Sequence, residues 1–227
     1  MKKTLLLVGV LVATSSMGWA GTCSSGTLAD YIALGTAGCT IGDKTFSDFG
    51  YSKAGTFPIP AADIGVTPCP SANCTHSGIP AGEEGFLFSA SWQVVAGQTL
   101  DSTIGYTVTS TSLIVDAFLS AAGLGPTNPS ASGFVSIAET LSNTTNALGV
   151  GTPNTGLGST DSLTFPGVKS LDVIKDIALT GATSGARVSV VANAFSQMPK
   201  VPEPASMLLF GSGLLALGGY VRRRKRS

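Results

Sequence analysis

At residues 86–93 the chain reads Phe-Leu-Phe-Ser-Ala-Ser-Trp-Gln. Phe86, Phe88, Ala90 and Trp92 recur at every second position and alternate with mostly polar residues. Successive side chains of a β-strand point to opposite faces, so a period of two places one apolar face against a core. The stretch therefore predicts a half-buried β-strand.

Further strands are expected on both sides of this stretch, at 44–51, 104–108, 113–119, 134–141, 171–179 and 188–195. Segments 44–51 and 104–108 alternate in the same way, whereas 113–119 is an apolar segment interrupted by Asp116. One apolar residue of the first segment is out of phase, and segment 134–141 also fits a short helix. Residues 27–34 fit a short helix or a strand. Turn-forming residues predict a turn at 96–98 and loops at 121–132 and 143–160.

Several short strands separated by turns predict an all-β fold. The architecture we expect is an antiparallel β-sandwich, either jelly-roll-like or Ig-like. A closed barrel is the alternative. We divide the chain into a signal peptide (1–20), an extracytoplasmic domain (21–199) and a sorting tail (200–227).

The central domain is acidic. Residues 21–199 contain five Lys or Arg and twelve Asp or Glu, a net charge of −7. The remaining cations lie in the two terminal segments, so the net charge of zero for the whole chain is misleading. An acidic domain repels the phosphate backbone, which argues against nucleic acid as a partner.

The N-terminal segment has the layout of a secretory signal peptide. Lys2 and Lys3 precede an apolar run that is short for a membrane span, and small residues precede a cut between Ala20 and Gly21. We therefore expect export through the Sec translocon. The lipoprotein alternative is disfavoured because Cys23 lies beyond the cut rather than at it.

The C-terminal segment combines three physically different pieces. The first piece is an extended bend formed by Val201, Pro202, Glu203 and Pro204. Its backbone is extended because proline disfavours the α region for the residue before it. Residues 205–221 are uncharged and give about 25 Å of helix, enough for a thin bilayer. The run ends in a basic cluster that should stay cytoplasmic: Arg222, Arg223, Arg224, Lys225 and Arg226. We expect a single transmembrane helix; a buried core helix is the alternative.

This order resembles the PEP-CTERM sorting signal of Gram-negative bacteria. The resemblance implies a precursor held briefly in the inner membrane, cleavage at the motif by an exosortase-type membrane protease, and release or transfer to the cell surface. Residues 28–49 also resemble the start of many exported PEP-CTERM proteins of unknown activity. That likeness supplies no catalytic motif.

Four cysteines suggest disulfides, because export leads to an oxidising compartment. We expect the local pairs Cys23–Cys39 and Cys69–Cys74, although four cysteines allow three connectivities. Zinc held by Cys69, Cys74 and His76 is the alternative, but the spacing matches no common zinc site. We predict no metal and no cofactor.

The sequence offers no convincing catalytic residue. His76 is the single histidine and lies in a Pro-, Ser- and Gly-rich loop. Adjacent Glu83 and Glu84 would face opposite ways on a strand. Asp116 and Glu139 interrupt apolar segments and could approach each other in a sheet, as in a glycosidase pair; charges on a solvent face are the commoner case. We therefore expect a protein that is not an enzyme.

The leading functional hypothesis is a structural or adhesive protein of the cell surface or the biofilm matrix. The alternative is a module that binds exopolysaccharide, with Trp92 stacking on a sugar ring, although core packing of Trp92 is the stronger expectation. A secreted hydrolase ranks third. The triplets that begin at Asn73 and Asn143 match the acceptor for N-glycosylation.

Overall fold

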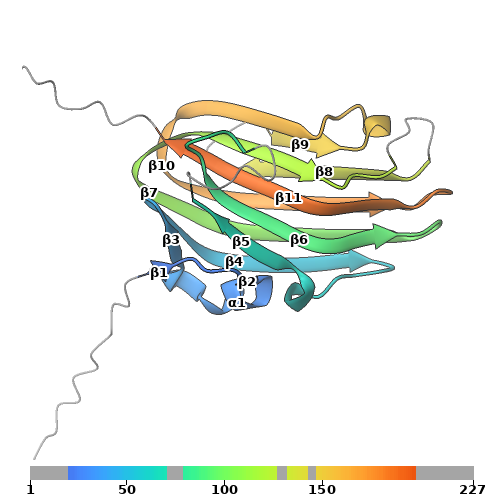
Figure 1. The fold of residues 1–227 in the computed structure, drawn as a ribbon, viewed down its shortest axis with the longest axis horizontal. Coiled ribbons are helices and arrows are strands. Elements are labelled where there is room, and N and C mark those ends of the chain that lie inside the picture. Colours follow the sequence, from blue (N-terminus) through green and yellow to red (C-terminus); the bar gives the residue numbers. More distant parts are fainter. Residues whose placement is uncertain (1–19, 71–78, 127–131, 143–146, 198–227) are drawn as a thin grey trace, which may run out of the picture.

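The computed structural model describes residues 20–70, 79–126, 132–142 and 147–197. These residues form β-strands almost throughout, which confirms the all-β prediction (Figure 1). The strands are β1 (Gly21–Thr22), β2 (Gly26–Thr27), β3 (Cys39–Ile41), β4 (Lys44–Gly55), β5 (Gly65–Cys69), β6 (Glu84–Val94), β7 (Thr99–Ala122), β8 (Phe134–Leu141), β9 (Ala147–Gly151), β10 (Thr160–Thr180) and β11 (Ala186–Gln197). The helices are α1 (Leu28–Ala33) and the short 3-10 turns η1 (Gly35–Ala37), η2 (Ala61–Asp63) and η4 (Pro153–Thr155).

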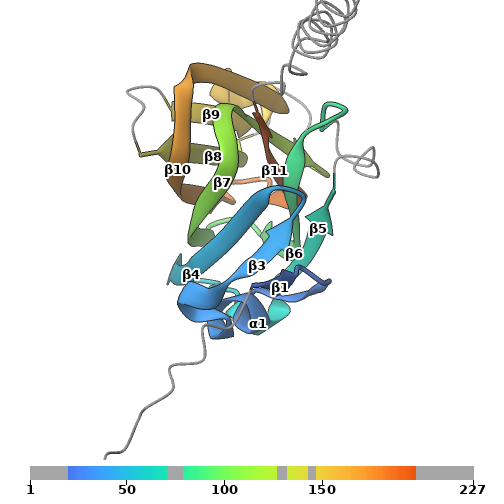
Figure 2. The same cartoon turned by 90° about the vertical axis from the view of Figure 1, so that its left-hand side faces the viewer.

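The strands belong to one sheet that curls into two facing layers (Figure 2). One layer has the order β1-β3-β4-β7-β10-β8-β9, and the other has the order β2-β5-β6-β11-β7-β10. The pairs are antiparallel, as predicted, except that β1 and β3 run parallel. The two layers thus have β7 and β10 in common.

Strands β7 and β10 pass from one layer into the other. Residues 100–110 of β7 pair with β4, and residues 114–122 pair with β11. Strand β10 follows β7 through both parts, with register shifts between Thr164 and Ser170. Pro166 lies inside this shifted segment, where its missing N–H breaks no regular ladder. The sequence predicted two separate strands at 104–108 and 113–119, whereas the structure has one bent strand.

A bulge in β4 explains why one apolar residue of segment 44–51 is out of phase with the alternation. Asp48 has φ of 55°, and the pairing with β7 shifts register between Ser47 and Gly50. An extra residue in one strand resets which face the following side chains occupy. Phe46 and Phe49 are therefore both buried, although they are three residues apart.

The core between the layers is aromatic at its centre. The rings of Phe46 on β4 and Phe86 on β6 lie 4.7 Å apart in an edge-to-face arrangement, which joins the two layers. Tyr106 of β7 stacks on Phe49 at 5.2 Å. Trp92 is fully buried and donates its indole N–H to Ser102 Oγ at 3.3 Å. It is therefore a core residue.

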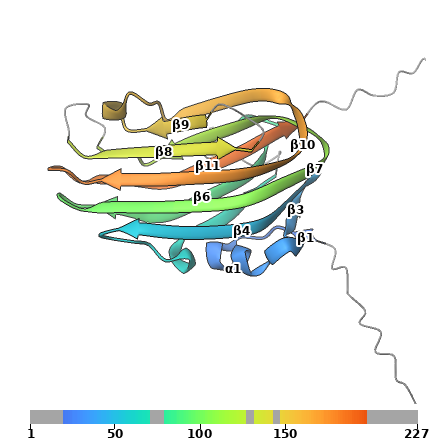
Figure 3. The ribbon, with the colours of Figure 1, turned by 180° about the vertical axis from the view of Figure 1, so that it is seen from behind.

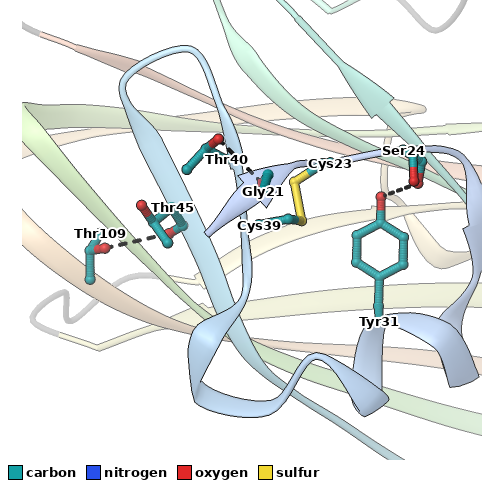
Figure 4. The surroundings of a disulfide bond; sticks show 8 residues. All are labelled: Gly21, Cys23, Ser24, Tyr31, Cys39, Thr40, Thr45 and Thr109. Atoms are coloured by element: carbon teal, nitrogen blue, oxygen red, sulfur yellow. Dashed lines mark hydrogen bonds between the residues drawn. A yellow bond between two sulfur atoms is a disulfide. The ribbon is translucent and has the colours of Figure 1, made fainter. Parts of the chain in front are cut away.

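Helix α1 and a disulfide close one edge of the core. Thr27 caps α1 by accepting from the Asp30 N–H, and the Asp30 carboxylate accepts from the Thr27 N–H in return. Cys23 and Cys39 form a disulfide with a sequence separation of 16, beside the β1–β3 pair (Figure 4). On the chain-entropy model a loop of this size contributes about 3 kcal/mol.

The predicted turn at 96–98 is present, with Gly97 at φ of 77°. The loop expected at 143–160 is only partly right, because β9 and η4 lie within it. Leu148 and Val150 of β9 are buried against the core, so a Gly-rich segment gains enough apolar contact to pair with β8. Gly151 allows this approach, since a Cβ there would meet the Val135 carbonyl at 2.5 Å.

We expect Phe46→Ala to lower the free energy of unfolding by about 3–5 kcal/mol, because it empties a fully buried site between the layers. Phe57→Ala is the matched control: Phe57 is 56% exposed, and its truncation should cost no more than about 0.5 kcal/mol. Urea unfolding of both variants measures the difference. Equal losses would show that the layers are not joined through Phe46.

Candidate functional site

Strand β11 ends at a buried charge cluster. Lys44 on β4 is fully buried, and its Nζ lies 3.1 Å from Asp43 Oδ1, 3.1 Å from Glu84 Oε2 and 3.0 Å from Gln197 Oε1. The ammonium group has three N–H donors, and these three acceptors match them. Gln197, the last residue of β11, is thereby fixed to β4 and β6, three residues before Lys200.

The turn before Lys44 is shaped by the same cluster. Gly42 has φ of 57°, in the left-handed region that favours glycine. A Cβ at Gly42 would overlap the Glu84 carboxylate. This glycine therefore allows Glu84 to reach Lys44.

A second pair of contacts fixes the end of β11. The Ser196 N–H donates to Asp116 Oδ1 at 2.9 Å, and the Ser196 hydroxyl donates to Asp116 Oδ2. Asp116 thus serves as a local acceptor for β11. The last two described residues of the domain are both held by side chains of other strands.

Glu83 lies beside this cluster, but its hydrogen bonding and its pKa set it apart from the other carboxyl groups there. It is 8% exposed, and its Oε2 has no hydrogen-bond partner among the described residues. Burial raises the pKa of Glu83 to about 7, and the negative charge of Asp116 adds to the rise, while Lys44 opposes it. Glu83 therefore changes its protonation near neutral pH.

The centre of the molecule holds a second polar cluster, formed by Lys175, Glu139, Asn193 and Tyr106. Lys175 of β10 lies opposite Glu139 of β8 in the ladder, and its Nζ forms an ion pair with Glu139 Oε2. Asn193 of β11 donates from Nδ2 to Glu139 Oε1 at 2.9 Å. The Tyr106 hydroxyl of β7 donates to Asn193 Oδ1.

This cluster has almost no contact with bulk solvent. Lys175, Glu139 and Asn193 are fully buried, and Tyr106 is 3% exposed. Burial lowers the pKa of Lys175 and raises that of Glu139, while their mutual attraction opposes both shifts. Burial also raises the pKa of Tyr106 well above its usual value. Both shifts within the ion pair favour the neutral amine and the neutral acid.

A groove of about 610 Å³ lies at the opposite end of the molecule, where β6 ends and β11 begins. It is lined by Gln93 and Val94 of β6, by Gly125 and Pro126, and by Ser184 and Arg187 on the β11 side. The Arg187 side chain packs beside Gly125, where a Cβ would meet Nε at 3.1 Å. The size suits a small ligand, and Arg187 supplies one positive charge.

Several predicted site residues are placed by the structure. Gly21 is exposed at the start of β1, so a cut after Ala20 leaves β1 and the Cys23–Cys39 disulfide intact. Cys69 is also disulfide-bonded, and its predicted partner Cys74 lies outside the described residues. The following predicted residues also lie outside them: Asn73, His76, Asn143, Val201, Pro202, Glu203, Pro204, Arg222, Arg223, Arg224, Lys225 and Arg226.

The idea that Asp116 and Glu139 form a carboxylate pair finds no support in these contacts. Asp116 binds Ser196 at the end of β11, whereas Glu139 binds Lys175 and Asn193 in the core. The solvent-face alternative is wrong for Glu139, which is fully buried. Glu83 and Glu84 are both buried, but only Glu84 binds Lys44.

Lys175 and Asn193 were not among the candidate site residues predicted from the sequence. A signal was present, because Lys175 falls in phase with Val173, Ile177 and Leu179 on the apolar face of its strand. A charged residue at a core position predicts a buried partner.

Two features are absent from the part of the chain that the structure describes. No group of three or more His, Cys, Asp or Glu side chains within it is arranged to hold a metal ion. No helix within it is long and apolar enough to cross a membrane.

The comparisons with known proteins concern mainly the tail. The family model of the PEP-CTERM protein-sorting motif matches residues 200–225. The chain therefore carries this motif immediately after the domain that ends with β11. The motif indicates an exported protein whose membrane-anchored precursor is processed by an exosortase, a membrane protease. No curated protein sequence matches the chain.

Two solved structures share limited similarity with the chain. TmCBM61 in complex with β-1,4-galactotriose is 9% identical over 65% of this chain and 88% of that chain, with a TM-score of 0.32. The enzymatically active domain of tailspike protein 4 of bacteriophage CBA120 is 12% identical over 67% of this chain and 20% of that chain, with a TM-score of 0.30. At these TM-scores neither structure carries an argument about this chain.

We expect the stability of the domain to depend on Glu83 between its ordinary pKa of 4.5 and its folded value of about 7. In this window the folded chain binds more protons than the unfolded chain. The free energy of unfolding therefore falls as the pH rises, and the contribution is lost above the folded pKa. Glu83→Gln should remove this part of the slope, as measured by urea unfolding from pH 4 to pH 8.

The matched control for this experiment is Asp63→Asn, which changes an exposed carboxyl group on η2 in the same way. It should leave the slope unchanged. If Glu83→Gln unfolds with the same pH dependence as the unmodified domain, Glu83 is already ionised at pH 5 and its burial has no such effect.

Proposed function

We propose that this chain is an exported structural or adhesive protein, delivered to the cell surface or the extracellular matrix through its C-terminal motif, with no catalytic turnover. The observation that carries this proposal is the sorting motif at residues 200–225. The proposal includes removal of residues 1–20 and insertion of residues 205–221 as one transmembrane helix. The assignment of the two layers to a jelly-roll-like or an Ig-like sandwich is part of the same proposal.

The end of β11 supports this reading of the tail. Ser196 and Gln197 are held by Asp116 and Lys44, so the folded domain extends almost to the motif. Pro202 is five positions after Gln197, and an extended chain covers at most about 18 Å over five positions. The domain end that contains Lys44 and Glu84 would therefore lie close to the membrane in the precursor.

The state of the polar groups supports a role without turnover. The side chains of Lys175, Glu139 and Asn193 are fully buried, so a soluble substrate cannot reach them. Asp116 and Glu84 are engaged in holding strand ends together. A protein of this kind contributes its stable fold and its location.

Mass spectrometry of the protein recovered from the culture and the cell surface tests the proposal. We expect an N-terminus at Gly21 and a C-terminus near Pro204. Replacing both Pro202 and Pro204 by Ala should leave the tail attached, because the extended bend offered to the protease is lost. Pro60→Ala, at an exposed proline before η2, is the control and should be processed normally.

Recovery of the unmodified protein with Ser227 still attached would contradict processing at the motif. Equal processing of the double variant would show that the bend is not what the protease recognises.

The second candidate function is binding of exopolysaccharide, and the groove beside Arg187 favours it. This groove is lined by backbone and polar side chains as well as apolar ones, and its guanidinium suits an acidic sugar. Trp92 cannot stack on a ligand directly, because it is fully buried. Its neighbour on β6, Gln93, lines the groove, so Trp92 can report on binding.

A glycan array followed by a tryptophan fluorescence titration tests this candidate. Trp92 is the single tryptophan of residues 21–199, so any change in emission has one source. Arg187→Ala should weaken binding of an acidic polysaccharide, whereas Lys53→Ala, at an exposed site on β4, should not. Failure of every matrix polysaccharide to bind would remove this candidate.

A further inference from the structure

The buried cluster of Lys175, Glu139 and Asn193 brings three groups of complementary reactivity together in a dry core. An amine is a nucleophile, a carboxamide is an acyl donor, and a carboxyl group moves protons between them. One carboxyl group holds both nitrogens: Glu139 Oε2 contacts Lys175 Nζ, and Glu139 Oε1 contacts Asn193 Nδ2 at 2.9 Å. The amine and the amide are thus neighbours on either side of one acid.

The orientation of the Asn193 amide is fixed by its contacts. Its Nδ2 donates to the Phe118 carbonyl at 3.0 Å and to Glu139, while its Oδ1 accepts from the Tyr106 hydroxyl. The nitrogen therefore faces the acid and the oxygen faces a hydrogen-bond donor. This is the arrangement needed when the nitrogen leaves and negative charge develops on the oxygen.

We propose that Lys175 and Asn193 join in an intramolecular isopeptide bond, formed by the folded protein itself with Glu139 as the acid and base. The Lys175 Nζ attacks Asn193 Cγ and forms a new C–N bond. The neutral carboxyl group of Glu139 gives its proton to Nδ2 and takes one from the attacking nitrogen, so it is regenerated. The bond between Cγ and Nδ2 breaks, and ammonia leaves. No oxidant, metal or other reactant is consumed.

Each residue has a defined role in this step. Lys175 must attack as the neutral amine, and burial favours that form. Tyr106 stabilises the charge on Oδ1 in the tetrahedral intermediate. Complete burial excludes water, which would otherwise compete by hydrolysing the Asn193 amide. The fold keeps the reacting groups together, which replaces a collision between separate molecules.

The bond would link parts of the sheet that hydrogen bonds do not join directly. Lys175 is on β10 next to β8, whereas Asn193 is on β11 between β6 and β7 in the facing layer. Seen from behind in Figure 3, the layer of β4, β7, β10 and β8 lies in front of the layer that contains β11. A covalent link at this point would hold the two layers together even when the rest of the domain unfolds. This inference is independent of how the tail is sorted.

Peptide mapping of the protein isolated from producing cells tests the proposal. Trypsin cuts after Lys and Arg, so an unlinked chain yields the peptides 170–175, 176–187 and 188–200. In the linked protein Lys175 is blocked, and residues 170–187 should appear joined to the peptide that contains Asn193. The mass of this branched peptide should be lower by one ammonia, about 17 Da, than the summed masses of the peptides 170–187 and 188–200.

Variants then assign the roles. Glu139→Gln, which keeps the size of the side chain, should slow bond formation by about 100-fold or more, and Tyr106→Phe should slow it by less. Glu84→Gln is the matched control, because it alters the other buried Lys–Glu pair and should leave the branched peptide intact. Recovery of only the three linear peptides from folded, unmodified protein would overturn the proposal and leave the cluster as an ordinary buried ion pair.

Discussion

Strands β7 and β10 run through both layers of the sheet, so the layers cannot separate unless the bend in these strands opens or one layer loses its pairing with them. The bend is possible because bulges and Pro166 interrupt the ladder where the chain turns from one layer to the other. Because the two layers share these strands, the bent parts of β7 and β10 close one side of the core. The aromatic centre and the buried charges depend on this enclosure.

The buried cations differ in what they do. Lys44 satisfies three acceptors at the end of the domain, and one of them is the last residue of β11. Lys175 has one carboxylate partner in a region without solvent. Taking an ammonium and a carboxylate out of water is costly, and a well-packed apolar pair would often be as stable. The first cation fixes the end of β11 to β4 and β6; the second finds an explanation in the proposed covalent bond.

Much of the fold could be predicted from the sequence because the period of two is a local property. The strand at Phe86–Gln93 is an example. The Cys23–Cys39 disulfide could be predicted because its cysteines are close in the sequence. The bend of β7 could not be predicted, because it depends on which strand lies beside each half. The bulge at Asp48 was visible only as a defect in the alternation.

The candidate sites show the same limit more clearly. The sorting motif is a continuous stretch, so its residues could be read directly from the sequence. The cluster in the core comes from four strands, and register alone brings Lys175 opposite Glu139. Asn193 joins them from the facing layer, a relationship that no spacing in the sequence encodes. The charge of Glu139 was noticed in the sequence, but its burial and its partners depend on the sheet.

The proposed function and the Cys23–Cys39 disulfide both require that this domain folds outside the cytoplasm after its leader has been removed. The most direct measurement is thiol alkylation combined with N-terminal sequencing of the protein in separated cell fractions. We predict protein outside the cytoplasm that begins at Gly21 and whose Cys23 and Cys39 react only after reduction. Protein that remains soluble in the cytosol, begins at Met1 and has reactive thiols would contradict the account.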